Sequence, residues 1–235
     1  MPGYLRPTGP IAACALLPAD PGHALALAQQ LLVKPLMANH NHGLWGYTGA
    51  TATGLELTIQ ASGVGAASAD AVLGELIDHG ARGAIRIGTC VAIDDNLGPA
   101  DVVVASAAIV DRVGRPTDEP SRPEPALLAA LERRLGSAAV AGTVASSDLV
   151  AGLTDRGRKA AWRERGAVAV DLETAAVLAL GARRGIAVAS ALLVAGGDDA
   201  ELGAGLLDLG ASCADALAQV ARPDQRSASG TGTPA

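Results

Sequence analysis

The chain has 235 residues, of which 49% are hydrophobic, and a formal net charge of −6. This length suffices for one large α/β domain with a substantial core, and the hydrophobic share makes disorder improbable except at the ends. The negative charge and the lack of a basic stripe argue against a nucleic-acid partner.

Strand and helix patterns alternate along the first half of the chain. Asp20 can cap a helix that begins at Pro21, and Gly80 stops a later helix. Gly49 and Gly54 are expected in turns. Strands are predicted over residues 11–17, 44–48, 55–60, around Arg86 and 102–110, and the later helix over 68–79.

The second half continues the alternation after a loop rich in proline and charge, predicted over Pro116–Pro125. Helices are predicted over residues 126–135, 155–165, 173–184 and 206–220, and strands over 138–145, 168–171 and 186–194. This pattern predicts a three-layer α/β/α sandwich with a central mixed, largely parallel sheet. We expect a single domain over residues 1–222 and a disordered tail over 223–235.

The cysteines and histidines do not form a recognisable metal site. Cys14, Cys90 and Cys213 are odd in number and widely spaced, which favours a reduced, cytoplasmic setting. His40 and His42 lie close together, but no nearby cysteine or acidic residue completes a zinc set. No apolar run approaches the length of a membrane span, so we expect no membrane partner.

The segment Gly83–Cys90 is the most informative part of the chain. It places Arg86 near the end of a short apolar run, followed by Gly88 and Thr89. An arginine is costly to bury without an anionic partner, and a glycine lets a ligand approach the backbone. Two interpretations stay open: an oxyanion site at the carboxyl end of a strand, or an arginine paired with a structural carboxylate.

Several segments together resemble the nucleoside phosphorylase superfamily, the group of hexameric purine nucleoside phosphorylases and uridine phosphorylases. The similarity runs from about Leu16 to Val220. Each segment alone is a weak match, but all of them occur in the order typical of the family. The segments are Leu16–Pro21, Gly46–Gly49, Ser62–Gly65 with Glu75 and Leu76 downstream, Ile85–Cys90 and Val170–Ala176.

The resemblance implies an enzyme that breaks the N-glycosidic bond of a nucleoside with phosphate as the nucleophile. It implies no metal and no organic cofactor, since phosphate is a co-substrate. The sugar passes through a state like an oxocarbenium ion. Such a site needs an anion pocket, a carboxylate at the sugar hydroxyls and a group that helps the base to leave.

Arg86 and Thr89 resemble the family's phosphate-binding residues, and Gly63–Gly65, with Val64 at its centre, resembles a backbone turn beside the sugar. Glu173 resembles the glutamate that accepts hydrogen bonds from the ribose hydroxyls. The alternative for Glu173 is an acidic residue that offsets the dipole of the helix it precedes. The resemblance therefore implies that Arg86 and Glu173 lie on opposite sides of one pentose-sized cavity.

The neighbouring positions of this segment depart from the family. Asp171 and Leu172 stand where the family usually has glutamate and methionine. Leucine keeps an apolar wall against the substrate, whereas aspartate shortens the reach of the carboxylate by one methylene. Val150 stands near the place where the family often has an aromatic residue at the base.

Two expected phosphate-binding arginines are replaced by histidines. His23 occupies the position of the first-loop arginine, where Ala19 replaces the loop glycine, and His42 the position of an arginine donated across a dimer interface. Histidine is largely neutral at neutral pH unless an anion raises its pKa, so phosphate binding should be weaker. Each histidine either faces the ligand or is an inert loop residue.

The acid that would protonate the leaving base does not stand at the sequence position typical of the family. Family spacing from Glu173 leads to Gly196, and an aspartate follows only after Gly197. Asp198 is the candidate acid, with Asp199 behind it, provided that the glycines allow the loop to shift. The alternative is a solvated turn.

Three functions remain open from these residues. The first is a phosphorylase-like pentosyltransferase acting on a nucleoside or a nucleoside analogue. The second is a nucleosidase that uses water, and the third is a catalytically weakened nucleoside-binding protein. The resemblance also implies a homodimer or a homohexamer built as a trimer of dimers, in which His42 completes a neighbour's site.

Overall fold

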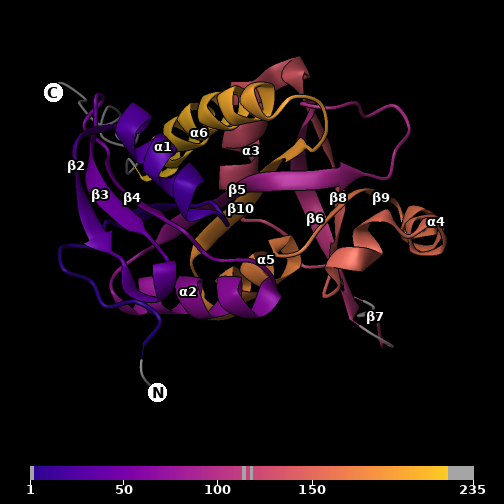
Figure 1. Ribbon diagram of the computed structural model, residues 1–235, viewed down its shortest axis with the longest axis horizontal. Coiled ribbons are helices and arrows are strands. Elements are labelled where there is room, and N and C mark those ends of the chain that lie inside the picture. The colour runs from indigo at the N-terminus through magenta and orange to yellow at the C-terminus, as the bar shows by residue number, and fades with distance from the viewer. Residues whose placement is uncertain (1–2, 113–114, 117–118, 222–235) are drawn as a thin grey trace, which may run out of the picture.

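The computed structural model describes residues 3–112, 115–116 and 119–221 (Figure 1). The strands are β1 (Cys14–Leu17), β2 (Leu32–Asn39), β3 (Gly46–Thr51), β4 (Glu56–Gln60), β5 (Gly83–Ala92), β6 (Val102–Arg112), β7 (Arg115–Pro116), β8 (Ala139–Ser147), β9 (Ala167–Asp171) and β10 (Ala187–Val194). The helices are α1 (Pro21–Leu31), α2 (Ala66–Asp78), α3 (Pro125–Leu135), α4 (Arg156–Glu164), α5 (Thr174–Arg184) and α6 (Asp199–Ala221), with short 3-10 helices η1 (Asn41–Gly43), η2 (Gly136–Ala138) and η3 (Val150–Thr154).

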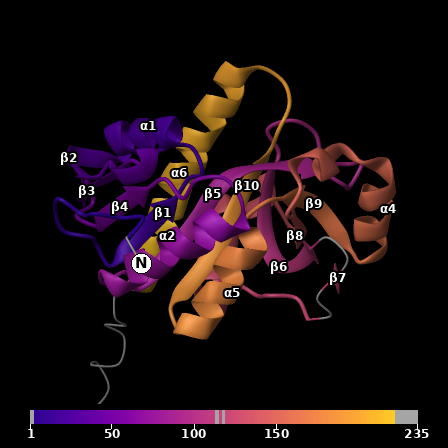
Figure 2. The ribbon, with the colours of Figure 1, turned by 60° about the horizontal axis from the view of Figure 1, so that its bottom comes forward.

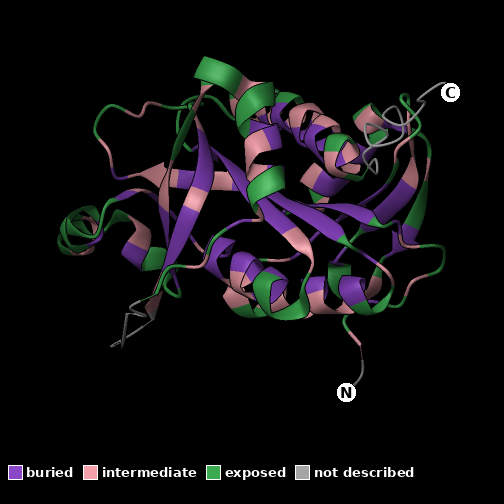
Figure 3. Cartoon of the chain, turned by 180° about the vertical axis from the view of Figure 1, so that it is seen from behind, coloured by how far each residue is buried: buried purple, intermediate pink, exposed green. Residues whose placement is uncertain are grey.

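Helices cover both faces of a central sheet, as the alternating pattern predicts. Helices α1, α3 and α6 lie on one face, and α2 and α5 lie on the other (Figure 1). Each face has its own apolar core against the strands. The strands themselves are mostly buried when the molecule is seen from behind (Figure 3). The predicted three-layer α/β/α architecture is therefore confirmed.

The sheet is mixed, and half of it closes on itself. Parallel pairings join β4 to β1, β1 to β5 and β5 to β10, while β2, β3 and β4 form an antiparallel edge. Strands β5, β10, β6, β8 and β9 form a closed ring, because β10 pairs with both β5 and β6 and β9 pairs with both β8 and β5. Figure 2 shows this ring on the opposite side from β2 and β3.

Helix boundaries follow local signals in the sequence. The side chain of Asp20 accepts a hydrogen bond from the His23 backbone N–H and caps α1, as predicted. Asp155 caps α4 in the same way, and Gly185 ends α5 in the left-handed conformation. These residues act through their neighbours in the chain, which explains why the sequence reveals them.

Several predicted boundaries differ from the structure. Strand β2 was not predicted, because it shows no alternation and contains Pro35; it exists by pairing with β3 at the sheet edge, where proline is tolerated. Gly49 lies inside β3 and not in a turn, whereas Gly54 lies in a turn as predicted. Helix α6 begins at Asp199, more than one and a half turns before position 206, where the sequence predicted its start.

Parts of two other predictions fall outside the described residues. The predicted tail over 223–235 does so entirely, and the predicted loop after Pro116 does so at positions 117–118. The described end of that loop pairs with β6 through Ser121 and Ala108. Within the described ranges, the longest helices are too short or too polar to cross a bilayer.

Gly181 sets the approach of α5 to the sheet. A Cβ atom at this position would lie 2.1 Å from Cγ2 of Val188 on β10, which is a stiff β-branched side chain. We expect Gly181→Ala to lower the free energy of unfolding by about 1–3 kcal/mol through overpacking. The matched control is Gly203→Ala in α6, where the added Cβ meets nothing within 4 Å and should stabilise the helix slightly. Urea unfolding of the two variants measures both effects, and equal midpoints would contradict the packing argument.

Candidate active site

The candidate site lies beside the middle of β5, next to the point where β1 ends. Arg86 on β5 is in register with Leu17, the last residue of β1, and with Ser190 on β10. Strand β9, which pairs with β5, ends at Asp171. Segments far apart in the chain therefore meet at one edge of the sheet, which is where open α/β folds bind ligands.

A cavity of about 330 Å³ opens at this edge. This volume is at the lower end of the range for small-molecule sites. Most of the residues predicted from the sequence line it, and they come from the loop after β1, the turn before α2, β5 and the end of β9. They are His23, Val64, Arg86, Thr89, Asp171, Leu172 and Glu173.

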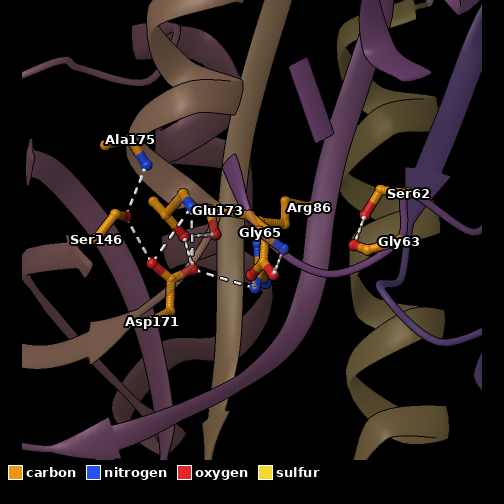
Figure 4. Close-up of polar contacts among 10 residues, drawn as sticks. Ser62, Gly63, Gly65, Arg86, Ser146, Asp171, Glu173 and Ala175 are labelled. Atoms are coloured by element: carbon orange, nitrogen blue, oxygen red, sulfur yellow. Dashed lines mark hydrogen bonds and ion pairs between the residues drawn. The ribbon is translucent and has the colours of Figure 1, made fainter. Parts of the chain in front are cut away.

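Arg86 and Glu173 line the same cavity but touch each other (Figure 4). The Nη2 atom of Arg86 forms a close ion pair with Oε2 of Glu173, and it lies 3.1 Å from Oδ2 of Asp171. The expectation that Arg86 and Glu173 face each other across a pentose-sized gap is therefore wrong in its geometry. The reason is burial: Arg86 is only 3% exposed, and a guanidinium removed from water needs anionic partners.

The Arg86 guanidinium has hydrogen-bond donors that these two carboxylates do not use. Its Nε and Nη1 atoms are buried and have no hydrogen-bond partner among the described residues. Gly88 makes room for this arrangement, since a Cβ atom there would lie 2.6 Å from Nη1. Buried donors of a charged group are costly to leave unpaired, so this guanidinium is suited to a bound anion.

Glu173 is turned toward the cavity by a loop from the other side of the site. Its Oε1 atom accepts a hydrogen bond of 2.7 Å from the backbone N–H of Gly65, whose φ of +90° suits glycine. Its side chain makes no capping hydrogen bond to α5, although Glu173 is the residue that precedes this helix. A capping hydrogen bond is thus not the contact that fixes this side chain.

Asp171 is surrounded by donors of the protein itself. It accepts hydrogen bonds of 2.6 Å from the hydroxyls of Ser146 and Thr174 and one of 3.0 Å from the Thr174 backbone N–H, in addition to the ion pair with Arg86 (Figure 4). Burial raises the pKa of Asp171, and Arg86 acts in the opposite direction. The structure therefore engages Asp171 inside the protein, where the sequence predicted a substrate contact.

Two other titratable groups at the cavity respond to the same surroundings. Burial alone would lower the pKa of Arg86, but Asp171 and Glu173 raise it overall, so the guanidinium stays charged. Burial, and after it the nearby Asp171, raises the pKa of the Cys90 thiol to about 12. Cys90 is accordingly a neutral thiol at neutral pH and not a nucleophile.

The first loop brings His23 to the cavity. The backbone N–H of His23 is held by Asp20 at the start of α1, and its half-buried side chain lines the cavity together with Ala19. His23 and Arg86 therefore line the same cavity, so an anion bound at Arg86 could also contact His23. Its position agrees with the ligand-facing interpretation.

Val150 and Gly63 lie outside this cavity. Val150 is 64% exposed and lines a neighbouring groove of about 820 Å³, which shares Val64 and Leu172 with the cavity. Gly63 has a φ of +72° and packs against Ser68, so it shapes the turn before α2 without lining the cavity.

The structure does not bring Asp198 to the cavity. Asp198 is exposed, and its side chain accepts a hydrogen bond of 2.9 Å from the Ala200 backbone N–H at the start of α6. Asp199 is already the first residue of that helix. The cavity is lined instead by Ala195, because the two glycines of the turn lead the chain away from the site.

His42 also lies away from the cavity of its own protomer. It is exposed in η1 with a φ of +56°, and its ring contacts that of Tyr4 in a tilted arrangement with centroids 5.5 Å apart. This position neither supports nor contradicts a role at a neighbour's site.

Sequence reasoning missed the hydroxyl groups that support Asp171. Ser146 is the second-last residue of β8, Thr174 begins α5, and Ser190 lies in β10, where its hydroxyl is 2.9 Å from that of Thr174. A polar residue inside an apolar strand is a usable signal, since buried polar groups need partners. Ser146 and Ser190 both have that pattern.

Comparisons with known proteins agree with this geometry. The Phosphorylase superfamily matches residues 13–222. A DeoD-type purine nucleoside phosphorylase of Clostridium beijerinckii is 31% identical over 199 residues, covering 80% of this chain and 82% of the relative. One of Geobacillus kaustophilus is 32% identical over 198 residues, with 80% and 82% covered. With most of both chains aligned and the shared segments gathered at one cavity, the chain belongs to the phosphorylase superfamily.

Proposed function

We propose that this protein is a pentosyltransferase of the nucleoside phosphorylase type, which cleaves the N-glycosidic bond of a nucleoside with phosphate. The observation that carries the proposal is the buried Arg86 guanidinium, whose Nε and Nη1 donors are unpaired beside Glu173 in a small-molecule cavity. Family membership supports the same reaction. The relatives are named as purine nucleoside phosphorylases, so purine nucleosides are the first substrates to test.

In the proposed reaction, a phosphate oxygen forms a bond to C1′ of the sugar while the C1′–N bond to the base breaks. The electron pair of the broken bond goes to the base, which takes up a proton. Arg86, Thr89 and His23, which all line the cavity, are the groups proposed to bind phosphate. Glu173 supplies a negative charge that stabilises the developing positive charge of the sugar. Because Asp198 lies outside the cavity, we assign the proton of the leaving base to solvent.

A second candidate function, hydrolysis by water, is favoured by the charges at the cavity. Arg86 is the only arginine or lysine among the described residues that line it, whereas Asp20, Asp171 and Glu173 all line it too. A phosphate dianion would bind weakly in such surroundings, and water carries no charge. The two reactions differ in product: sugar phosphate in one and free sugar in the other.

We also propose that the active unit is a homodimer, on its own or as part of a homohexamer. The groove beside the cavity is lined by exposed apolar side chains, including Val64 and Val150, which a second copy would cover. In such a dimer His42, which is exposed in η1, would be the residue donated to the neighbouring protomer. The cytoplasm is the proposed compartment, because Cys14, Cys90 and Cys213 are all free thiols.

A nucleoside panel tests the proposed reaction directly. Purified protein is incubated with purine and pyrimidine nucleosides, with and without phosphate, and base and sugar products are separated by chromatography. Phosphate-dependent release of base with formation of a pentose 1-phosphate is expected. Release that ignores phosphate would establish the hydrolase, and no release from any nucleoside would contradict both.

Arg86→Lys tests the anion site without leaving Asp171 and Glu173 unpaired. Lysine keeps the positive charge but loses the planar fork, so we expect the phosphate-dependent kcat/KM to fall by about 100-fold. The matched control is Arg134→Lys, which changes an exposed ion pair with Asp215 far from the cavity and should leave kcat/KM unchanged. Equal activities of the two variants would show that Arg86 is only structural.

Mixing two inactive variants tests whether His42 completes a neighbour's site. Subunits with His42→Ala and subunits with Glu173→Gln are each expected to have low activity. Random reassembly into dimers should recover about a quarter of the wild-type activity, because half of the dimers then contain one intact site. Full activity of His42→Ala alone, or no recovery on mixing, would contradict the shared site.

A further inference from the structure

The cluster around Arg86 holds more negative than positive charge. Arg86, Asp171 and Glu173 are 3%, 2% and 3% exposed, so water screens their charges poorly. One guanidinium faces two carboxylates through the same Nη2 atom. With both carboxylates ionised, the net charge of this buried cluster is −1.

The hydrogen bonds around Asp171 suit an ionised carboxylate. The hydroxyl of Ser146 accepts a hydrogen bond from the Ala175 backbone N–H and donates its own hydrogen to Asp171. The hydroxyl of Thr174 donates to Asp171 as well, so Ser190 must be the donor to Thr174. The guanidinium, a backbone N–H and two hydroxyls all face Asp171, and an ionised carboxylate can accept from all of them at once.

The same contacts separate the roles of the two carboxylates. Asp171 is saturated by Ser146, Thr174 and Arg86, and its side chain points into the protein network that joins β8, α5 and β10 (Figure 4). Among the described residues, the Glu173 carboxylate has hydrogen bonds only with Arg86 and the Gly65 backbone N–H, and each of its oxygens has a lone pair left. Glu173 is therefore the carboxylate available to sugar hydroxyls.

We propose that Asp171 sets the anion selectivity of this site: it holds Arg86 in place and adds the second buried negative charge, so that the site takes a singly charged phosphate in preference to a doubly charged anion. This inference rests on the proposed anion site at Arg86. Phosphate exists in both charge states near neutral pH, whereas sulfate is doubly charged throughout. Sulfate is consequently the discriminating probe, since it has the same shape as phosphate and lacks the proton.

The other charged groups that face the cavity do not offset this excess. Asp20 adds a further carboxylate at the rim, and Cys90 is a neutral thiol. His23 is the remaining titratable side chain that lines the cavity. The experiment is run at one fixed pH, pH 8, for every variant.

Titration calorimetry of the unliganded protein with sulfate and with phosphate tests the proposal. Asp171→Asn keeps the shape of the side chain and removes its charge, and we expect its sulfate affinity to rise about tenfold over wild type. Asp171→Glu restores a carboxylate and should bind sulfate as weakly as wild type. Asp215→Asn, an exposed partner of Arg134, is the control for a general loss of negative charge and should have no effect.

An unchanged or lower sulfate affinity in Asp171→Asn would overturn the proposal. Thermal unfolding checks the fold of each variant, and Asp171→Ser serves as the neutral replacement if the asparagine variant does not fold. If Asp171 instead touched the sugar, Asp171→Asn would change the ratio of kcat/KM between ribonucleosides and 2′-deoxyribonucleosides, which we expect to stay constant. Calorimetry needs no turnover, so a wild-type protein that fails to cleave nucleosides would contradict the proposed function without deciding the role of Asp171.

Discussion

The structure around the cavity depends on the burial of one guanidinium. Arg86 lies in the central strand β5, out of contact with water, and its charge is balanced by Glu173 and Asp171. Without these carboxylates the guanidinium would be an uncompensated charge, which is costly in a low-dielectric interior. This one requirement ties β5 to the end of β9 and the start of α5, and through Gly65 to the turn before α2.

The pairing of Arg86 with two carboxylates affects how well the site can bind an anion. The guanidinium that should attract an anion is already shared by two carboxylates, and the two other cations that the family resemblance led us to expect are His23 and His42. The site is thus poorer in positive charge than its family pattern, while it keeps a glutamate beside the proposed sugar position. We therefore expect a low affinity for phosphate, because the contacts that hold the fold together here also occupy the guanidinium.

The predictions from sequence succeeded where the signal was local or repeated. The alternation of strands and helices predicted the layered fold, and Asp20 and Pro21 marked the start of α1, because caps act on the nearest backbone groups. The predictions failed where contact with a distant segment decides whether a strand or helix forms. Strand β2 exists only because β3 lies beside it, and the start of α6 depends on Asp198, which the sequence offered equally well as an acid.

The sequence by itself determined which residues belong to the site: a buried arginine, a glycine beside it and an acidic pair 85 and more positions later, in the order typical of a known family. Only the tertiary structure decided how they are arranged. It placed Arg86 and Glu173 in contact, turned Asp171 into the protein and led Asp198 away from the cavity. The reason is that a motif fixes the identity of a side chain, whereas its partners and direction depend on which strands and turns pack around it once water has been excluded.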